Sequence, residues 1–338
     1  MMLVLNCGSQ SIKWKLFYPD LNIKKEGHLK ILGNKNFEKG LIGELGKIKK
    51  LGEEINIIGH RVVHSGGKLK SPLTITSKNL KELEKFNNLA PLHNPFNILG
   101  IKFSQSVFPK AKQLAFFDTS FFAELPERAF IYALPEKLQK MYGIRRFGFH
   151  GISHEFAASE AAKITDRPVG DLNIITCHLG GGSSIAAIKN GKAIDTSMGF
   201  TPMEGLVMMT RGGDIDPGLI FYLNKKVKNL ESVLNYESGV KGLCGLSEML
   251  DVLKAVEKGS KKAKLALDIF VYSVQKYIGA YFAVLGKCDL LVFTGSIGAG
   301  SKKIVDMICN DLSILKDTKV LQIKDNESLA IAQKIKNL

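Results

Sequence analysis

Residues 3–18 read LVLNCGSQSIKWKLFY, and residues 173–195 read NIITCHLGGGSSIAAIKNGKAID. Each stretch begins with an apolar run, passes through a turn of glycine and serine, and enters a second run in which apolar residues recur, as in two strands joined by a turn. The pair Asn190-Gly191 adds a further hairpin signal to the second stretch. The same pattern near the start and near the middle of the chain predicts a duplicated domain.

Elsewhere the apolar periodicity indicates helices that alternate with strands. A third apolar run ends in a glycine-rich turn at residues 289–301, DLLVFTGSIGAGS. Residues 264–285 are largely apolar but contain Asp268, Gln275 and Lys276, which favours a core helix over a membrane span. Alternating strands and helices predict the α/β class, with a domain boundary near residues 118–125. Further helices are expected over residues 78–86, 154–162, 247–257 and 302–312.

Bulk properties favour a globular protein of two domains. The chain has 338 residues, which exceeds one average domain, and apolar residues make up 45% of it. It starts MMLVLN without a basic segment, apolar stretch and cleavage site, so we expect a cytoplasmic protein. The five cysteines are scattered without a CxxC pair, which predicts free thiols and no structural metal.

The net charge of +15 is compatible with either a nucleic acid or an anionic small molecule as a partner. The lysines are spread along the chain, and no basic helix carries interleaved aromatic residues. We therefore expect an anionic substrate and no nucleic-acid or membrane partner.

The glycine and serine turns are candidate phosphate sites. Such turns expose backbone N–H groups that can bind phosphate oxygens, although an ordinary hairpin turn is the alternative for any single copy. Three copies occur, and Asn6 and Lys13 flank the first of them. The repetition favours a phosphate site.

Two arginines stand where an anion would be bound. Arg61 lies in GHRVVHSGG (residues 59–67) and is expected just before a strand of Val62 and Val63, while Arg211 precedes a Gly-Gly pair. A guanidinium among apolar and glycine residues needs an anionic partner, which a substrate phosphate or carboxylate supplies; a structural salt bridge is the alternative. Asp118 and Glu327 are acids in sparse surroundings that suit a metal ion or the positioning of a nucleophile.

His150 and His154 are four residues apart in RRFGFHGISH, residues 145–154. On one helix this spacing is typical of a metal site, but no HExxH acid is present and glycines flank His150. We expect His150 to lie in a loop that begins the next helix. There an imidazole can stabilise a phosphoryl group during transfer.

Taken together, the motifs resemble those of acetate kinases, and the resemblance covers essentially the whole chain. Ten segments occur in the order seen in that family. They are residues 6–13, GHRVVHSGG (59–67), LAPLHNP (89–95), FFDTSF (116–121), RRFGFHGISH (145–154), HLGGGSS (178–184), DTSMGFTPMEGL (195–206), TRGGDIDP (210–217), KLALDIFVYSVQKYIGAY (264–281) and DNESLAIA (325–332).

The resemblance implies two RNase-H-like halves of the actin-like ATPase fold with the active site between them, in a homodimer. The halves would be residues 1–122 with 328–338, and residues 123–327. It implies direct transfer of a phosphoryl group between ATP and acetate, in acetyl-CoA biosynthesis, with Mg²⁺ or Mn²⁺ as cofactor. A propionate or butyrate kinase, a pyrophosphate-dependent enzyme and a non-catalytic actin-like binding protein are the alternatives.

The resemblance also implies roles for individual residues. Asp118 would orient the reacting groups, Arg61 would bind the acyl phosphate, and His150 and Arg211 would stabilise the phosphoryl group in transfer. Mg²⁺ would bind Asn6 and Glu327. The carboxylic acid would contact Arg61, Val63, Leu92, His93, Phe149 and Pro202.

The segments that would bind the nucleotide depart most from the family pattern. Gly181 stands for a usual asparagine, and Ala299 and Gly300 replace the acid and amide of the adenosine loop. This change leaves the phosphoryl donor open between ATP, another nucleotide and pyrophosphate. The residues implied for the nucleotide are Lys13, His178, Leu179, Gly180, Gly181, Gly182, Glu248, Met249, Leu250, Ser296, Ile297, Gly298, Ala299 and Gly300.

Overall fold

The computed structural model describes residues 1–31, 36–67, 69, 71–91 and 93–338. The chain forms two compact units, which we treat separately: unit 1 is Met1–Ala123 with Asn326–Leu338, and unit 2 is Glu124–Asp325. The boundaries expected from the resemblance differ from these by one residue in the middle of the chain and by two near its end. Residues 326 and 327 belong to unit 1 because the last helix packs against the first sheet.

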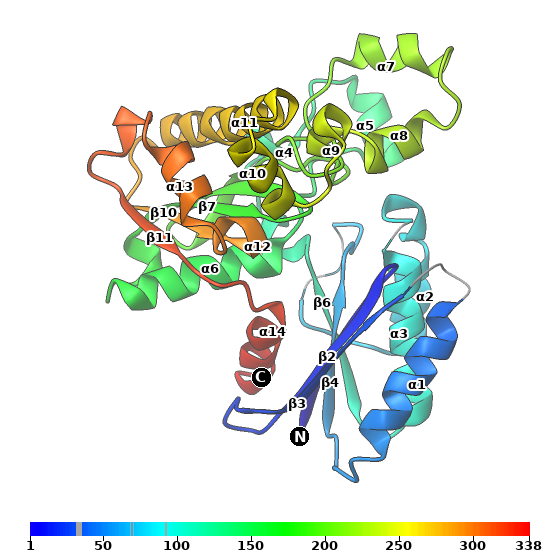
Figure 1. Ribbon diagram of the computed structural model, residues 1–338. Coiled ribbons are helices and arrows are strands. Elements are labelled where there is room, and N and C mark those ends of the chain that lie inside the picture. Colours follow the sequence, from blue (N-terminus) through cyan, green and yellow to red (C-terminus); the bar gives the residue numbers. More distant parts are fainter. Residues whose placement is uncertain (32–35, 68, 70, 92) are drawn as a thin grey trace. The chain divides into compact units, whose positions relative to one another are not determined.

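Unit 1 is a sheet with the strand order β3-β2-β1-β4-β6-β5 and helices on both faces (Figure 1). One face packs against α3, since a Cβ at Gly100 of that helix would lie 2.7 Å from Cys7 Sγ in β1. The other face packs against α14, since a Cβ at Gly59 of β4 would lie 2.7 Å from Ile331. The elements are β1 (Met2–Gly8), β2 (Ser11–Phe17), β3 (Ile23–Lys30), α1 (Phe37–Lys49), β4 (Ile57–Val62), β5 (Leu73–Thr74), α2 (Ser77–Glu84), α3 (Asn94–Val107), β6 (Lys112–Phe117) and α14 (Glu327–Lys336).

Unit 2 is a sheet with the order β11-β10-β7-β8-β9. The 25-residue helix α11 packs on it, begins at the Ser260 cap and ends at Gly286 in the left-handed conformation. The strands are β7 (Asn173–Leu179), β8 (Ser183–Lys189), β9 (Lys192–Thr196), β10 (Leu290–Thr294) and β11 (Lys319–Gln322). The helices are α4 (Glu127–Phe130), α5 (Glu136–Tyr142), α6 (Gly151–Ile164), α7 (Pro217–Asn224), α8 (Leu230–Tyr236), α9 (Gly239–Cys244), α10 (Met249–Glu257), α11 (Lys261–Leu285), α12 (Gly295–Gly298) and α13 (Lys302–Cys309).

The two sheets repeat one topology, which confirms the predicted duplication. In each, an antiparallel hairpin feeds a parallel pair of five residues: Met2–Asn6 beside Ile57–Arg61, and Ile174–His178 beside Leu290–Thr294. By this register Asn6 corresponds to His178. Lys13 and Arg61, the neighbours of Asn6, likewise correspond to Ser184 and Thr294, the neighbours of His178.

The predicted helices are all present, with boundaries displaced by up to three residues. One strand prediction was wrong: Arg61 does not precede a strand but lies inside β4, which ends at Val62. The strand extends back to Ile57 because apolar residues before Arg61 pair with β1 and β6. All five cysteines are free. None of the helices within the described ranges is long and apolar enough to cross a membrane.

Candidate active site

In unit 1 three polar side chains form a row across the ends of neighbouring strands. Lys13 of β2, Asn6 of β1 and Arg61 of β4 are direct register partners, so their side chains leave the same face of the sheet. Asp118 follows the last residue of β6, and Glu327 is the first residue of α14, which covers this face. We call Asn6, Arg61, Asp118 and Glu327 the Arg61 cluster.

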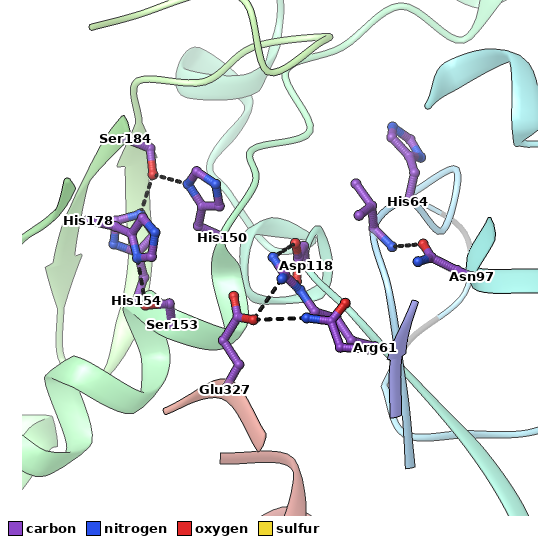
Figure 2. A network of polar contacts seen from close by, with 12 residues as sticks. Arg61, His64, Asn97, Asp118, His150, Ser153, His154, His178, Ser184 and Glu327 are labelled. Atoms are coloured by element: carbon purple, nitrogen blue, oxygen red, sulfur yellow. Dashed lines mark hydrogen bonds and ion pairs between the residues drawn. The ribbon is translucent and has the colours of Figure 1, made fainter. Parts of the chain in front are cut away.

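The Arg61 guanidinium holds the cluster together. Its Nε and Nη2 donate to the two oxygens of Asp118 at 3.0 and 2.7 Å, and its Nη1 pairs with Glu327 Oε2 at 2.6 Å (Figure 2). Asp118 is 2% exposed, so the bidentate pair is shielded from solvent. A structural salt bridge and an anion site are the two alternatives for Arg61. The salt bridge is present, because three of the five N–H groups of Arg61 bind the protein's own carboxylates.

Two carboxylates on one guanidinium leave the Arg61 cluster with a formal charge of −1. A phosphate approaching it would be repelled, whereas a divalent cation would be attracted. Asn6 Nδ2 lies 3.4 Å from Glu327 Oε2, and rotating the Asn6 amide by half a turn would direct its oxygen to the same point. The described residues contain no group of three or more His, Cys, Asp or Glu side chains that would bind a metal unaided. The cluster therefore fits Mg²⁺ that is bound mainly by substrate phosphates and water.

Two asparagines of α3 hold the segment that follows Arg61. Asn97 accepts a hydrogen bond from the Val63 N–H at 3.0 Å and donates to the Cys7 carbonyl at 2.6 Å. Asn94 pairs with both the N–H and the carbonyl of His64, each at 3.0 Å. Both amides are buried, so they fix the backbone of Val63 and His64 relative to β1 and α3.

In unit 2 the corresponding row is Thr294, His178 and Ser184, on the face of the sheet that α6 covers. His150 is the N-cap of α6 and has a left-handed backbone with φ of 58°. This confirms the expected loop position that begins a helix. His150 Nδ1 lies 2.9 Å from Ser184 Oγ, and its ring stacks on that of His178 with centroids 4.3 Å apart (Figure 2).

The turn between β7 and β8 opens beside His150. The N–H of Gly180 donates to Gly182 O and to Ser183 Oγ. The N–H groups of Gly181 and Gly182 donate to no acceptor within the described chain. A Cβ at Gly182 would lie 3.5 Å from both Arg211 Nη1 and His150 Cε1. The absent side chain thus leaves space bordered by a guanidinium and an imidazole.

Arg211 follows β9 in the chain, lies beside this turn and is largely buried, but it has no carboxylate partner among the described residues. Its Nη1 donates to the Pro202 carbonyl at 3.1 Å and contacts Met208 Sδ at 3.8 Å. Burial lowers the pKa of the guanidinium from its ordinary value, since the charge is costly there. We call His150, His178, Ser184 and Arg211 the His150 cluster.

The other predicted residues lie in varied surroundings. Leu92 is outside the described residues. Val63, His93 and Pro202 are half-buried, whereas Phe149 is 2% exposed and packs as core. Lys13 is exposed on β2. On the nucleotide side Met249 and Ile297 are buried, Leu250 is 68% exposed, and residues 296–300 lie in and just after the short helix α12.

Several polar residues of the site were missed by sequence reasoning. Ser184 contacts two histidines, Ser153 contacts His178 and donates to Asp325, and Asn97 accepts from the Val63 N–H. Ser184 could have been found from the hairpin, because its register places it opposite His178. Asp325 and Asn97 are distant in sequence from their partners, so no local pattern indicates them.

Comparisons with known proteins identify the family of the chain. The Acetokinase family matches residues 36–333. The acetate kinase of Helicobacter acinonychis is 42% identical over 348 residues, covering 93% of this chain and 87% of that protein. The acetate kinase structure from Entamoeba histolytica has a TM-score of 0.90 at 32% identity, covering 100% and 99%. A propionate kinase structure from Francisella tularensis has a TM-score of 0.89 at 36% identity, covering 98% of both chains. The chain therefore belongs to the Acetokinase family.

Proposed function

We propose that the chain catalyses the reversible transfer of a phosphoryl group from ATP to acetate, which gives acetyl phosphate and ADP. Membership of the family makes the chain a kinase. The carboxylate acceptor, the donor and the roles of individual residues are parts of the proposal.

The observation that carries the proposal is that Arg211, which is largely buried, has no carboxylate partner among the described residues. A buried guanidinium without a protein carboxylate is costly unless an anion binds it. Arg211 borders the space over Gly182 together with His150. A phosphoryl group in transfer carries its charge on equatorial oxygens and is stabilised by such an arrangement.

The Arg61 cluster has a different task in the proposal. With its net negative charge it would hold Mg²⁺ through Asn6 and Glu327, and this metal, when bound, would neutralise the charge of the donor phosphates. Asp118 would keep the Arg61 guanidinium oriented through its two hydrogen bonds. Arg61 would bind the carboxylate of the acid or the acyl phosphate, as the resemblance implies, when bound Mg²⁺ offsets the negative charge of the cluster.

A second candidate acid is propionate, because a propionate kinase is among the similar solved structures at 36% identity. One methylene in an apolar pocket changes binding by only about 1–3 kcal/mol, so the two acids differ in efficiency and not in mechanism. The donor has alternatives too, because the nucleotide-side residues depart from the family pattern. The homodimer remains a prediction from the resemblance, and the cytoplasmic location remains a prediction from the sequence.

A panel of donors and acids tests the proposal. The purified chain is given Mg²⁺, one acid (acetate, propionate or butyrate) and one donor (ATP, GTP or pyrophosphate), and acyl phosphate is trapped as the hydroxamate. We expect the highest kcat/KM with ATP and acetate. No product with any pair would overturn the kinase assignment, and product with pyrophosphate alone would overturn ATP as donor. The Arg211→Ala variant is the blank for contaminating kinases.

A further inference from the structure

Two chains of hydrogen bonds run through unit 2 to the stacked rings of His150 and His178, and the second of them begins at the exposed Asp325. The first joins Thr176 Oγ1 to His154 Nδ1 at 2.7 Å, His154 Nε2 to Ser184 Oγ at 2.7 Å, and Ser184 Oγ to His150 Nδ1 at 2.9 Å. The second joins Asp325 Oδ1 to Ser153 Oγ at 2.9 Å and Ser153 Oγ to His178 Nδ1 at 2.8 Å. Thr176, His154, Ser184 and Ser153 are all 0% exposed, so solvent does not complete these contacts.

The direction of the second chain follows from Asp325, because a carboxylate only accepts hydrogen bonds. The single hydroxyl proton of Ser153 is therefore donated to Asp325. Ser153 Oγ must then accept from His178, which places a proton on His178 Nδ1. When His178 is neutral, its Nε2 carries a lone pair.

The direction of the first chain follows from Thr176. The hydroxyl of Thr176 is buried, and among the described residues it forms its hydrogen bond with His154. If Thr176 donates to His154 Nδ1, the proton of His154 is on Nε2 and is donated to Ser184. The Ser184 proton is then donated to His150 Nδ1, and the neutral His150 carries its proton on Nε2. The reverse direction would leave the buried Thr176 proton without an acceptor, which is unfavourable.

His154 is suited to this role because it stays neutral. Burial is the main cause that lowers its pKa well below the ordinary value, and the nearby His178 lowers it further. A neutral imidazole has one donor and one acceptor nitrogen, as the chain requires.

We propose that Thr176, His154 and Ser184 form a positioning relay that keeps the proton of neutral His150 on Nε2, while Asp325 and Ser153 keep the proton of His178 on Nδ1. The stacked pair then presents one N–H donor and one lone pair. His150 Nε2 lies 3.6 Å from the position that a Cβ of Gly182 would take, in the space bordered by Arg211. There an N–H would attract the anion and a lone pair would repel it.

Nitrogen-15 NMR of the histidine side chains in the full-length protein tests the assignment without any activity measurement. With ¹⁵N-histidine at pH 8, two-bond and three-bond couplings to the ring protons distinguish the two neutral tautomers. His150→Gln and His178→Gln variants assign the signals among the seven histidines. We expect protonated Nε2 in His150 and His154 and protonated Nδ1 in His178. Protonated Nδ1 in His150 or in His154 would overturn the relay.

Kinetics test what the relay does, and this part depends on the proposed function. We expect Ser184→Ala to lower kcat about tenfold, to change either KM less than twofold, and to give mixed tautomers at His150. Loss of stability with an unchanged His150 tautomer would mean that Ser184 is merely structural. Thr176→Val and Thr176→Ser form a second pair, in which only the serine should retain the wild-type tautomer. If the wild type transfers no phosphoryl group, the proposed function fails while the NMR result still stands.

Thr165→Val, at the opposite end of α6, is the matched control for loss of a hydroxyl. Thr165 Oγ1 donates to the Ala161 carbonyl at 2.9 Å and contacts no histidine in the described structure. It should leave the His150 tautomer and kcat unchanged. A tautomer shift in this variant would show that general destabilisation of α6 produces the effect, and would overturn the relay.

Discussion

At the scale of single residues, the Arg211→Ala variant distinguishes a catalytic role of Arg211 from a structural one. Its recorded side-chain contacts are one carbonyl and one thioether, so Arg211→Ala removes little that holds unit 2 together. It also removes a buried charge that has no carboxylate partner among the described residues. We expect a melting temperature equal to or above that of the wild type, and a kcat lower by about 10³-fold, as for other arginines that stabilise a transferring phosphoryl group.

The measurements are differential scanning fluorimetry and steady-state kinetics. Arg167→Ala serves as the control, because Arg167 forms a surface ion pair with Asp289 at 3.4 Å in the same unit. A KM for the acid that rises as much as kcat falls would assign Arg211 to ground-state binding.

Glu327 makes the metal proposal testable. Glu327→Gln keeps the shape of the side chain but turns the charge of the Arg61 cluster from −1 to zero, so the attraction for Mg²⁺ weakens. We expect the Mg²⁺ concentration for half-maximal rate to rise at least tenfold, in a titration at constant ionic strength. An unchanged Mg²⁺ requirement with a lower rate would indicate that Glu327 only orients Arg61.

At the scale of elements, the turn between β7 and β8 leaves a space for an anion only because residue 182 is glycine. A methyl group there would sit 3.5 Å from Arg211 Nη1 and His150 Cε1, which the fold tolerates but an anion would not. We expect Gly182→Ala to lower kcat/KM more than tenfold, with little change in melting temperature. Gly181→Ala is the comparison, because its Cβ would meet nothing within 4 Å. Equal losses of kcat/KM in both variants would contradict the proposal that an anion binds in the space beside Gly182.

The elements were predictable where their pattern is local. Helices α2, α6, α10, α11 and α13 follow from apolar periodicity, and their ends were displaced where a cap decides them. The helix α6 starts at Gly151, three residues before the predicted start, because His150 takes a left-handed backbone. Arg61 was misplaced relative to its strand because the apolar residues that extend β4 pair with distant strands. Whether an acid lies beside Arg211 depends on tertiary packing, which no sequence motif indicates; in the described part of the chain none does.

At the scale of the whole molecule, duplication explains why both units carry polar rows at equivalent strand ends. The sequence predicted this from two hairpins alone, but the register that aligns Asn6 with His178 required the structure. The same topology thus presents different chemistry: an acid-rich cluster in unit 1, and a cluster of imidazoles and a guanidinium in unit 2. Repeated backbone geometry provides the positions, and the side chains at those positions determine the task of each unit.

The stability of unit 1 should depend on pH through two buried histidines. Burial lowers the pKa of His60 and of His64 from 6.5 to about 4, although a hydrogen bond to Gln113 partly opposes the shift at His60. Between these values the unfolded chain binds protons that the folded unit does not, so the free energy of unfolding falls as the pH falls below 6.5. From pH 7 to 5.5 the loss should be about 2 kcal/mol for the pair.

Trp14 allows the free energy of unfolding of unit 1 to be measured alone, because Trp14 is the single tryptophan of the chain and is 3% exposed in that unit. Urea unfolding followed by its fluorescence therefore reports on unit 1 even if the two units unfold separately. In His60→Gln the loss between pH 7 and 5.5 should be about half that of the wild type, because one of the two titrating groups is gone. Equal losses in both proteins would show that His60 is protonated in the folded unit and that its burial does not set the pH dependence.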